Sequence, residues 1–305
     1  MLGVLVGFAI IAVIIATGYL VRRTGLLGDE ARYMLAKLVF FVLSPCLLLT
    51  VIADADPARL FSPLMLASLL AALSVFLVMF LVVRFVWRRK TAETVVTTLA
   101  AGYVNANNIG IPVAVYVLGD AAWVAPVILL QLLLITPLSL TALDLSTRGG
   151  VSVGRILAQP FRNPIIIGSA IGLVLALTKV PVPEAALEPF RIMGAAAVPL
   201  MLMNYGMSLH GQRLLQPGTG RRDVLTASAL KLFAMPLAAW LLGSALGISG
   251  HELFVVVALA ALPTAQNVFN YAQRYGRGET VARDTILITT VGSVAVLAVA
   301  AALLH

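Results

Sequence analysis

Long apolar segments separated by short polar loops are the dominant pattern of this chain. Each segment is close to the roughly 20 residues that a helix needs to cross a bilayer. The pattern predicts an all-α membrane protein with about ten transmembrane helices. The predicted spans are Leu2–Val21, Leu35–Ala53, Phe61–Trp87, Thr94–Leu118, Ala121–Leu145, Pro164–Lys179, Glu188–Leu209, Val224–Ile248, Leu253–Tyr275 and Thr285–Leu304.

Composition agrees with this pattern. Hydrophobic residues make up 61% of the 305 positions, charged residues only 11%, and the mean hydropathy is +1.02. These values exclude an ordinary soluble domain. The basic pair Arg22 and Arg23 follows the first apolar segment rather than preceding it, which indicates an uncleaved span and not a signal peptide. A single cysteine, Cys46, excludes an internal disulfide and a cysteine-based metal site, and we expect neither metal nor cofactor.

The net charge of +8 comes from basic residues that gather in alternate loops. The positive-inside rule explains this distribution better than nucleic-acid binding does. It predicts a multi-pass protein of the cytoplasmic (inner) membrane with both termini outside. The basic residues of the five predicted cytoplasmic loops are Arg22, Arg23, Arg32, Lys37, Arg84, Arg88, Arg89, Lys90, Arg148, Arg155, Arg162, Arg213, Arg221, Arg222, Arg274, Arg277 and Arg283.

Polar residues interrupt the predicted fourth span. Asn105, Asn107 and Asn108 are followed at once by Gly110 and Pro112. Lipid cannot hydrogen-bond a free peptide group, so a broken helix at membrane depth survives only where protein buries it or where it lines a watery cavity. We therefore expect substrate contacts from the three asparagines and from Pro112, and a hinge at Gly110. The alternative is that the amides only satisfy backbone groups that the break has freed.

The predicted ninth span carries a second interruption, formed by Pro263, Thr264, Gln266 and Asn267, which are further candidates for substrate binding. Paired interruptions in corresponding positions of two halves point to a substrate site. The alternative is that these polar side chains only form hydrogen bonds between helices.

The two halves of the sequence have prolines and polar residues at corresponding positions. A shift of 159 residues sets Asn108 on Asn267, and Pro45 in the second span resembles Pro199 in the seventh, which makes both prolines candidate helix breaks. Because five spans separate equivalent elements, the second half must be inverted. We expect a first repeat over 1–146, a cytoplasmic linker over 147–162 and an inverted repeat over 163–305. Chance similarity between apolar helices is the alternative.

Four other polar residues within predicted spans are candidates for substrate binding or coupling: Lys231, Gln131, Asn204 and Thr289. An intramembrane lysine is a functional candidate by default, although a long side chain near the cytoplasmic end could also reach back to the interface. For the three neutral residues, hydrogen bonds between helices are the alternative. No Asp or Glu falls near a predicted midplane, which favours transport without a titratable relay.

These breaks, together with Asn163–Pro164 at the start of the sixth span and Lys231 with Pro236 in the eighth, resemble the auxin efflux carrier family, in a bacterial form with a short central loop. The resemblance covers essentially the whole chain. It implies a fold similar to that of bile acid sodium symporters, with crossing fourth and ninth helices. It also implies a scaffold of spans 1, 2, 6 and 7, which forms a homodimer, and an elevator-like transport unit of spans 3–5 and 8–10.

By the same resemblance, the substrates are small organic anions such as auxin, malonate or malate. These substrates, together with the absence of Asp and Glu near the predicted midplane, favour a secondary transporter. The negative-inside membrane potential favours export of an anion. The alternative is a sodium-coupled importer of the bile acid type. An intramembrane enzyme would need a nucleophile with a base, or a metal cluster, at depth, and the sequence shows neither, so we expect no enzymatic activity. A passive channel fits two broken helices less well.

Overall fold

The structure is a computed structural model that describes residues 2–28, 30–54, 63–148, 163–211 and 220–304. Within these ranges every regular element is a helix, as the apolar pattern predicts. Most of the predicted linker, 149–162, lies outside the described residues. So do the loop residues Asp56, Arg59, Arg155, Arg162 and Arg213.

The first half of the chain contributes helices and several short π-helical or 3-10 turns, written η. These elements are α1 (Leu2–Thr24), α2 (Ala31–Leu38), η1 (Val39–Leu43), α3 (Ser44–Ala53), α5 (Pro63–Leu81), η2 (Val82–Val86), α6 (Thr91–Gly102), η3 (Ala106–Gly110), α7 (Ile111–Tyr116), η4 (Ala121–Val124), α8 (Ala125–Leu130), η5 (Gln131–Ile135) and α9 (Thr136–Arg148).

The described part of the second half also consists of helices, with one π-helical turn. Its elements are α11 (Pro164–Thr178), α12 (Glu184–Ala195), α13 (Ala197–Leu209), α14 (Arg221–Ala229), η6 (Leu230–Ala234), α15 (Met235–Ala245), α16 (Gly250–Ala261), α17 (Gln266–Tyr275) and α18 (Glu279–Leu304).

Six helical segments in the described part of the chain are long and apolar enough to cross a membrane. They are Ala31–Ala53, Pro63–Val86, Ala121–Thr147, Glu184–Leu209, Arg221–Ala245 and Glu279–Leu304. The apolar helices α11 and α16 are shorter. Both predicted interruptions are present, because α6 ends at Gly102 and α16 ends at Ala261. The total of ten spans stays a prediction.

Prolines shape several of the long helices by widening a turn rather than ending the helix. Pro45, Pro112, Pro137 and Pro236 each lie two residues after the end of a π-helical turn. Proline has no N–H and its ring collides with the carbonyl four residues earlier, and the wider π turn relieves both problems. The sequence predicted that the helix breaks at Pro45, but the helix Ala31–Ala53 continues through Pro45 with a π-helical turn before it. In the seventh span the interruption lies at Ala196, three residues before Pro199.

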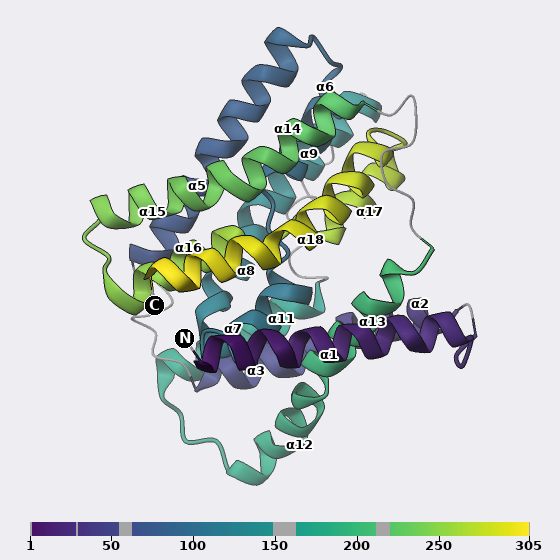
Figure 1. Cartoon of the computed structure of the whole chain (residues 1–305). Helices are drawn as coiled ribbons and strands as arrows, with labels where there is room; N and C mark the ends of the chain where they lie inside the picture. Colours follow the sequence, from purple (N-terminus) through teal and green to yellow (C-terminus); the bar gives the residue numbers. More distant parts are fainter. Residues whose placement is uncertain (1, 29, 55–62, 149–162, 212–219, 305) are drawn as a thin grey trace.

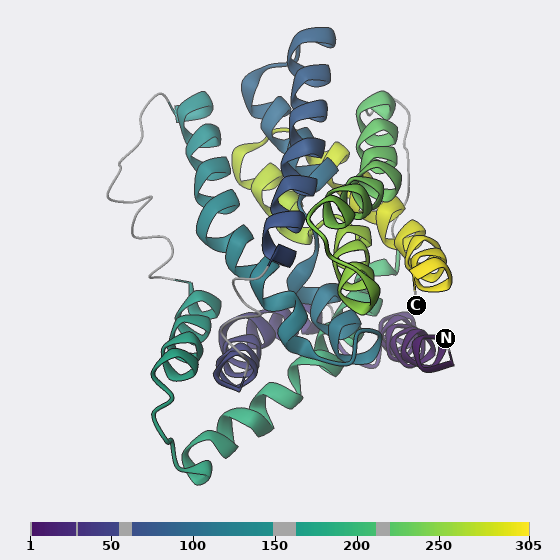
Figure 2. The same cartoon turned by 90° about the vertical axis from the view of Figure 1, so that its left-hand side faces the viewer.

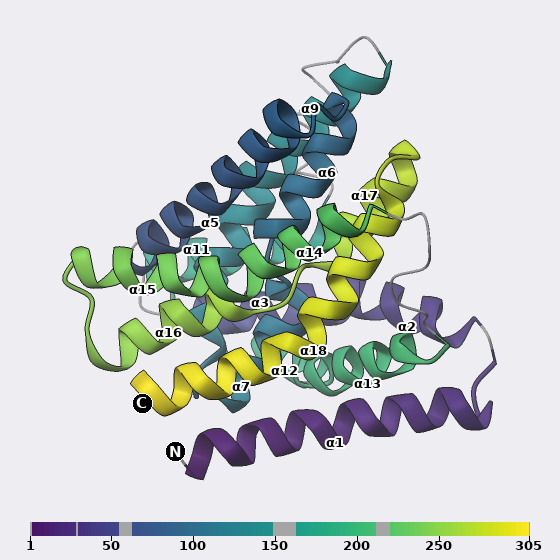
Figure 3. The ribbon, with the colours of Figure 1, turned by 45° about the horizontal axis from the view of Figure 1, so that its top comes forward.

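One group of helices packs closely through small residues. It contains α1, α2, α3, α11, α12 and α13, with α1 against α13 and α3 against both α11 and α12. Figures 1 and 3 show α1 running alongside α13. A Cβ at Gly168 would lie 2.5 Å from the carbonyl oxygen of Pro45, and one at Gly206 would collide with the carbonyl oxygen of Ile15. Glycine at these positions therefore permits the helix contacts.

The remaining helices form a second group around the two interrupted segments. Here α5 packs on α6 and α15, and α18 packs on α14 and α16. In Figures 1 and 2 most of this group lies above α1 and α12, while α7 packs against α1. Figure 1 also shows both chain ends on the same side as the turn between α15 and α16, whereas the α1–α2 and α17–α18 turns lie on the opposite side. The residues around these two turns belong to two of the predicted basic loops.

Candidate functional site

The two interrupted segments meet and cross in extended conformation. After α6 ends at Gly102, the chain runs extended to Asn105, and after α16 it runs extended to Ala265. Val104 and Thr264 form an antiparallel bridge at the contact. The unwound backbone of one break thus satisfies the other, which is how non-helical chain is tolerated away from water.

Two backbone hydrogen bonds fix the crossing. The N–H of Asn105 donates to the carbonyl of Pro263 at 2.8 Å, and the N–H of Ala265 donates to the carbonyl of Tyr103 at 3.0 Å. The donors Asn105 and Ala265 are 160 residues apart, and so are the acceptors Tyr103 and Pro263. This spacing is close to the shift of 159 residues that relates the polar residues of the two halves in the sequence. The crossing therefore has a local two-fold relation.

Thr264 ties the crossing to its neighbours. Its side chain is fully buried, and its Oγ1 donates to the carbonyl of Ala100 at 2.6 Å. Its N–H donates to Oγ1 of Thr289 at 3.1 Å. Thr264 and Thr289, both candidates from the sequence, are placed to hold the break together rather than to line a cavity.

The asparagines order the chain where helix resumes after the first break. Oδ1 of Asn105 accepts the N–H of Asn108 at 3.1 Å, which caps the helix that begins at Ala106. Nδ2 of Asn107 donates to Oδ1 of Asn108 at 3.1 Å. The Asn105 side chain therefore satisfies a backbone group that the break has freed, as the alternative interpretation of these amides predicts.

A cavity of about 700 Å³ lies against the crossing, between the two groups of helices. Its walls come from α2 and η1 on one side and from η3, η5 and α17 on the other. The polar and charged residues that line it are Arg32, Tyr33, Lys37, Tyr103, Asn105, Asn107, Asn108, Gln131, Thr136, Asn163, Asn204, Tyr205, Gln266, Asn267, Asn270 and Tyr271.

Hydroxyl groups join the two halves along one wall. The hydroxyl of Tyr103 lies 2.9 Å from Oγ1 of Thr136, which lies 3.4 Å from the hydroxyl of Tyr271. Tyr103 begins the extended segment of the first break, and Tyr271 lies on α17 after the second break, so the hydroxyl groups link the two interrupted segments.

Several buried polar atoms of the cavity wall have no hydrogen-bond partner among the described residues. They are Nδ2 of Asn105, Oδ1 of Asn107, Oε1 of Gln131, Oδ1 of Asn204 and the hydroxyl of Tyr205. Buried polar atoms are nearly always paired, and an unpaired set that faces one cavity indicates a place for a polar ligand. The buried side chains of Asn105 and Gln131, only 3% and 5% exposed, carry most weight.

The charge of the cavity is one-sided. Arg32 and Lys37, both on α2, line it, and no Asp or Glu is found among its described lining residues. The Nζ of Lys37 lies 4.3 Å from the ring centroid of Tyr33. Cations and neutral amide donors without a competing carboxylate favour an anion.

The structure brings together seven of the residues singled out from the sequence: Asn105, Asn107, Asn108, Gln131, Asn204, Gln266 and Asn267. It leaves the others outside the cavity lining. These are Gly110, Pro112, Pro263 and Thr264 at the crossing, Thr289 and Lys231 behind it, and Pro45 and Pro199 within the other group of helices.

Sequence reasoning missed several lining residues. Asn270 and Tyr271 lie four residues after Gln266 and Asn267, so they share a helix face, and this spacing was a usable signal. Tyr103 stands two residues before Asn105 and looked like ordinary span sequence. Arg32 and Lys37 were interpreted only as loop charges, because nothing in a single sequence shows which helix end faces a cavity.

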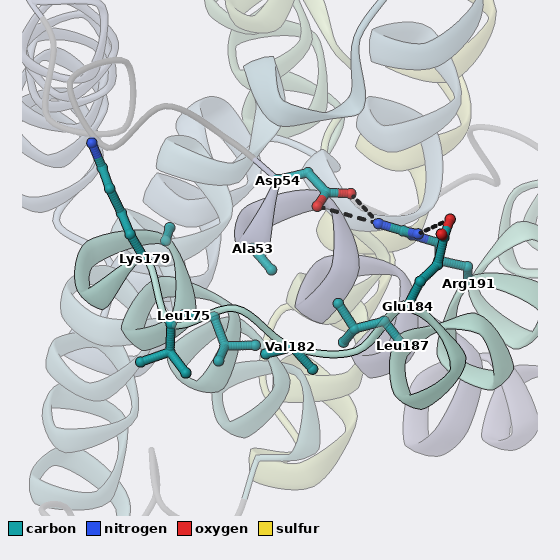
Figure 4. A pocket seen from close by; sticks show the side chains of 10 residues that line it. Ala53, Asp54, Leu175, Lys179, Val182, Glu184, Leu187 and Arg191 are labelled. Atoms are coloured by element: carbon teal, nitrogen blue, oxygen red, sulfur yellow. Dashed lines mark hydrogen bonds and ion pairs between the residues drawn. The ribbon is translucent and has the colours of Figure 1, made fainter.

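A second cavity of about 700 Å³ lies at the turn between α11 and α12, away from the crossing. Figure 4 shows the guanidinium of Arg191 between two carboxylates. It lies 3.1 Å from Asp54 and 3.6 Å from Glu184. Lys179 also lines this cavity. Its acids and bases offset one another, so it lacks the one-sided charge of the cavity at the crossing.

Known proteins resemble the chain along nearly its whole length. The sequence profile of one family, described as "Membrane transport protein", matches residues 4–154 and 150–301. A protein of Rhizobium meliloti named "Putative malonate transporter" is 28% identical over 92% of this chain and 90% of its own length. An "Uncharacterized transporter" of Methanothermobacter thermautotrophicus is 26% identical over 84% of this chain and 83% of its own length.

A further relative, the "Uncharacterized transporter YfdV" of Escherichia coli, is 23% identical over 93% of this chain and 92% of its own length. These names are those of transporters rather than enzymes. The profile match covers both halves, including both interrupted segments. The chain therefore belongs to the membrane transport protein family, the auxin efflux carrier family that its sequence resembles.

Proposed function

We propose that this protein is a secondary transporter of small organic anions, with its substrate site in the cavity at the crossing. The observation that carries the proposal is the composition of that cavity. Amides and hydroxyls from both breaks line it together with Arg32 and Lys37, and its described wall holds no carboxylate.

Neutral donors suit a carrier because they bind a carboxylate without holding it too tightly. The helix that starts at Ala106 and the helix α17, which starts at Gln266, both begin beside the cavity. Helix starts present free N–H groups and about half a positive charge, which stabilise an anion without a formal cation. Asn108 and Asn267 lie near these starts, and we propose them as the first substrate contacts.

Dicarboxylates such as malonate or malate, and auxin-like carboxylates, are the proposed substrates. The name of the Rhizobium meliloti relative supports malonate. A negative-inside membrane favours outward movement of an anion by about 2.3 kcal/mol per charge per 100 mV. We therefore propose export across the cytoplasmic membrane, with both termini outside and with Arg32 and Lys37 at the cytoplasmic entrance of the cavity.

We further propose that the two groups of helices move against each other as a scaffold and a transport unit. The position of the cavity between them supports this division, because a site at such a boundary is exposed to alternate sides when one group slides. The two-fold exchange of hydrogen bonds at the crossing supports two inverted five-helix repeats. A homodimer through the scaffold completes the proposal.

Flux in proteoliposomes tests the proposed function. Labelled malonate, malate and indole acetate are loaded in turn, while the sodium gradient, the pH gradient and the membrane potential are imposed separately. We expect flux of at least one dicarboxylate that follows the potential without sodium. Strict sodium dependence would instead favour a bile acid-type importer, and absence of flux for every anion would refute the substrate class.

A further inference from the structure

The helix α16 ends inside the protein with its last carbonyl groups lacking helical partners. If the helix continued, the N–H of Thr264 would donate to the carbonyl of Ala260. That N–H donates instead to Oγ1 of Thr289, at 3.1 Å, and Pro263 has no N–H. The break therefore releases the carbonyl oxygen of Ala260 toward the protein interior.

Lys231 binds this released carbonyl. It lies in the π-helical turn η6, and its Nζ donates to the carbonyl oxygen of Ala260 at 2.6 Å and lies 3.1 Å from Sδ of Met235. The residue is 0% exposed. A lysine that snorkelled to the membrane surface would keep its ammonium in water, so the structure excludes that interpretation of Lys231.

The corresponding end in the first half is closed in a different way. There α6 ends at Gly102, and the carbonyl of Ala100 accepts a hydrogen bond from the neutral hydroxyl of Thr264 at 2.6 Å. The position 159 residues before Lys231 is Ala72. Among the described residues, an amine therefore binds the α16 end of the crossing and a neutral hydroxyl binds the α6 end.

A helix C-terminus carries about half a negative charge, and in transporters with broken helices such ends coordinate the coupling cation. We propose that Lys231 is a built-in cation for the crossing. Its amine occupies the end of α16 where a coupling ion would otherwise bind, so that the break is stable without sodium. The transport measurements that test this proposal rest on the proposed function, whereas the unfolding measurements do not.

A small cavity next to these groups makes the proposal testable. Its volume is about 20 Å³, enough for one water molecule, and it is lined by both partners of Lys231, which are Met235 and Ala260. Gln131 and Val104 line this small cavity and also the cavity at the crossing. Truncation of Lys231 would enlarge the small cavity and leave space for a free ammonium ion beside the carbonyl of Ala260.

Two substitutions separate charge from shape. Lys231→Ala removes the amine and opens space, whereas Lys231→Met removes the amine and keeps most of the volume. Lys179→Met makes the same chemical change at an exposed lysine that does not line the cavity at the crossing, and it serves as the matched control. Thermal unfolding of the purified proteins is measured in methylammonium chloride and in choline chloride at equal concentration, because choline is too large for the space.

We expect wild type and Lys179→Met to unfold at the same temperature in both salts. Lys231→Ala should unfold several degrees lower in choline and recover by about 2–4 °C in methylammonium, since a ligand that binds only the native state stabilises it. Lys231→Met should fold, transport at least tenfold more slowly than wild type, and gain nothing from methylammonium.

Two results would overturn the proposal. One is transport by Lys231→Met at the wild-type rate, and the other is equal unfolding of Lys231→Ala in both salts. If Lys231→Ala does not fold, Lys231→Met decides alone. If wild type carries none of the anions, the proposed function fails, and the unfolding measurements still decide the role of Lys231.

Discussion

At the scale of single residues, Asn108 and Asn267 are the substrate contacts that we expect to matter most. Replacing either by alanine removes a hydrogen bond to a charged ligand, which contributes about 1.5–3 kcal/mol, or roughly a tenfold to hundredfold loss of transport. Folding and membrane insertion should be retained. Thr178→Val, at an exposed position at the end of α11, is the control, and undiminished flux in both asparagine variants would place the site elsewhere.

Arg32 and Lys37 should act through their charge at the cavity entrance. We expect Arg32→Gln and Lys37→Gln to raise the KM for a dianion several-fold at low ionic strength, with a smaller effect on kcat. The effect should shrink as salt is added, because salt screens exposed charges. Initial rates measured at several salt concentrations test this prediction. A KM change that does not depend on salt would indicate direct contact or altered structure instead.

At the scale of elements, the stability of the crossing depends on hydroxyl groups from neighbouring helices. Thr289→Val leaves the buried N–H of Thr264 without its acceptor, which costs about 1–3 kcal/mol. Unfolding should therefore occur several degrees lower. Thr290→Val is the matched control, because the buried Oγ1 of Thr290 has no hydrogen-bond partner among the described residues. Equal losses in both variants would contradict this role for Thr289.

The elements also show what a single sequence can predict. The apolar pattern predicts the helical class and both interrupted spans, because lipid forces long apolar runs and makes polar interruptions costly. It cannot separate a proline that ends a helix from one that widens a turn, as at Pro45, since both remove the same N–H. Nor can it show that Lys231 turns inward to Ala260 rather than outward to the interface, because that depends on the packing of α16.

At the scale of the whole molecule, the cavity should be open toward the side of the basic loops. We expect a cysteine placed at Asn270, in a Cys46→Ser background, to react with a membrane-impermeant thiol reagent from the cytoplasmic side. A cysteine at Lys179, on the turn before α12, should react from the outside. Labelling of both positions from the same side would contradict the proposed orientation and the inverted relation of the halves.

The site at the crossing is tested most directly by calorimetric titration of the purified carrier with malonate and malate. The isosteric change Asn108→Asp places a carboxylate in the cavity and should abolish binding by repelling the anion, whereas Lys179→Met should bind as wild type does. Binding of at least one dicarboxylate to wild type, lost in Asn108→Asp, is the predicted result. Equal binding to wild type and Asn108→Asp would contradict an anion site at the crossing.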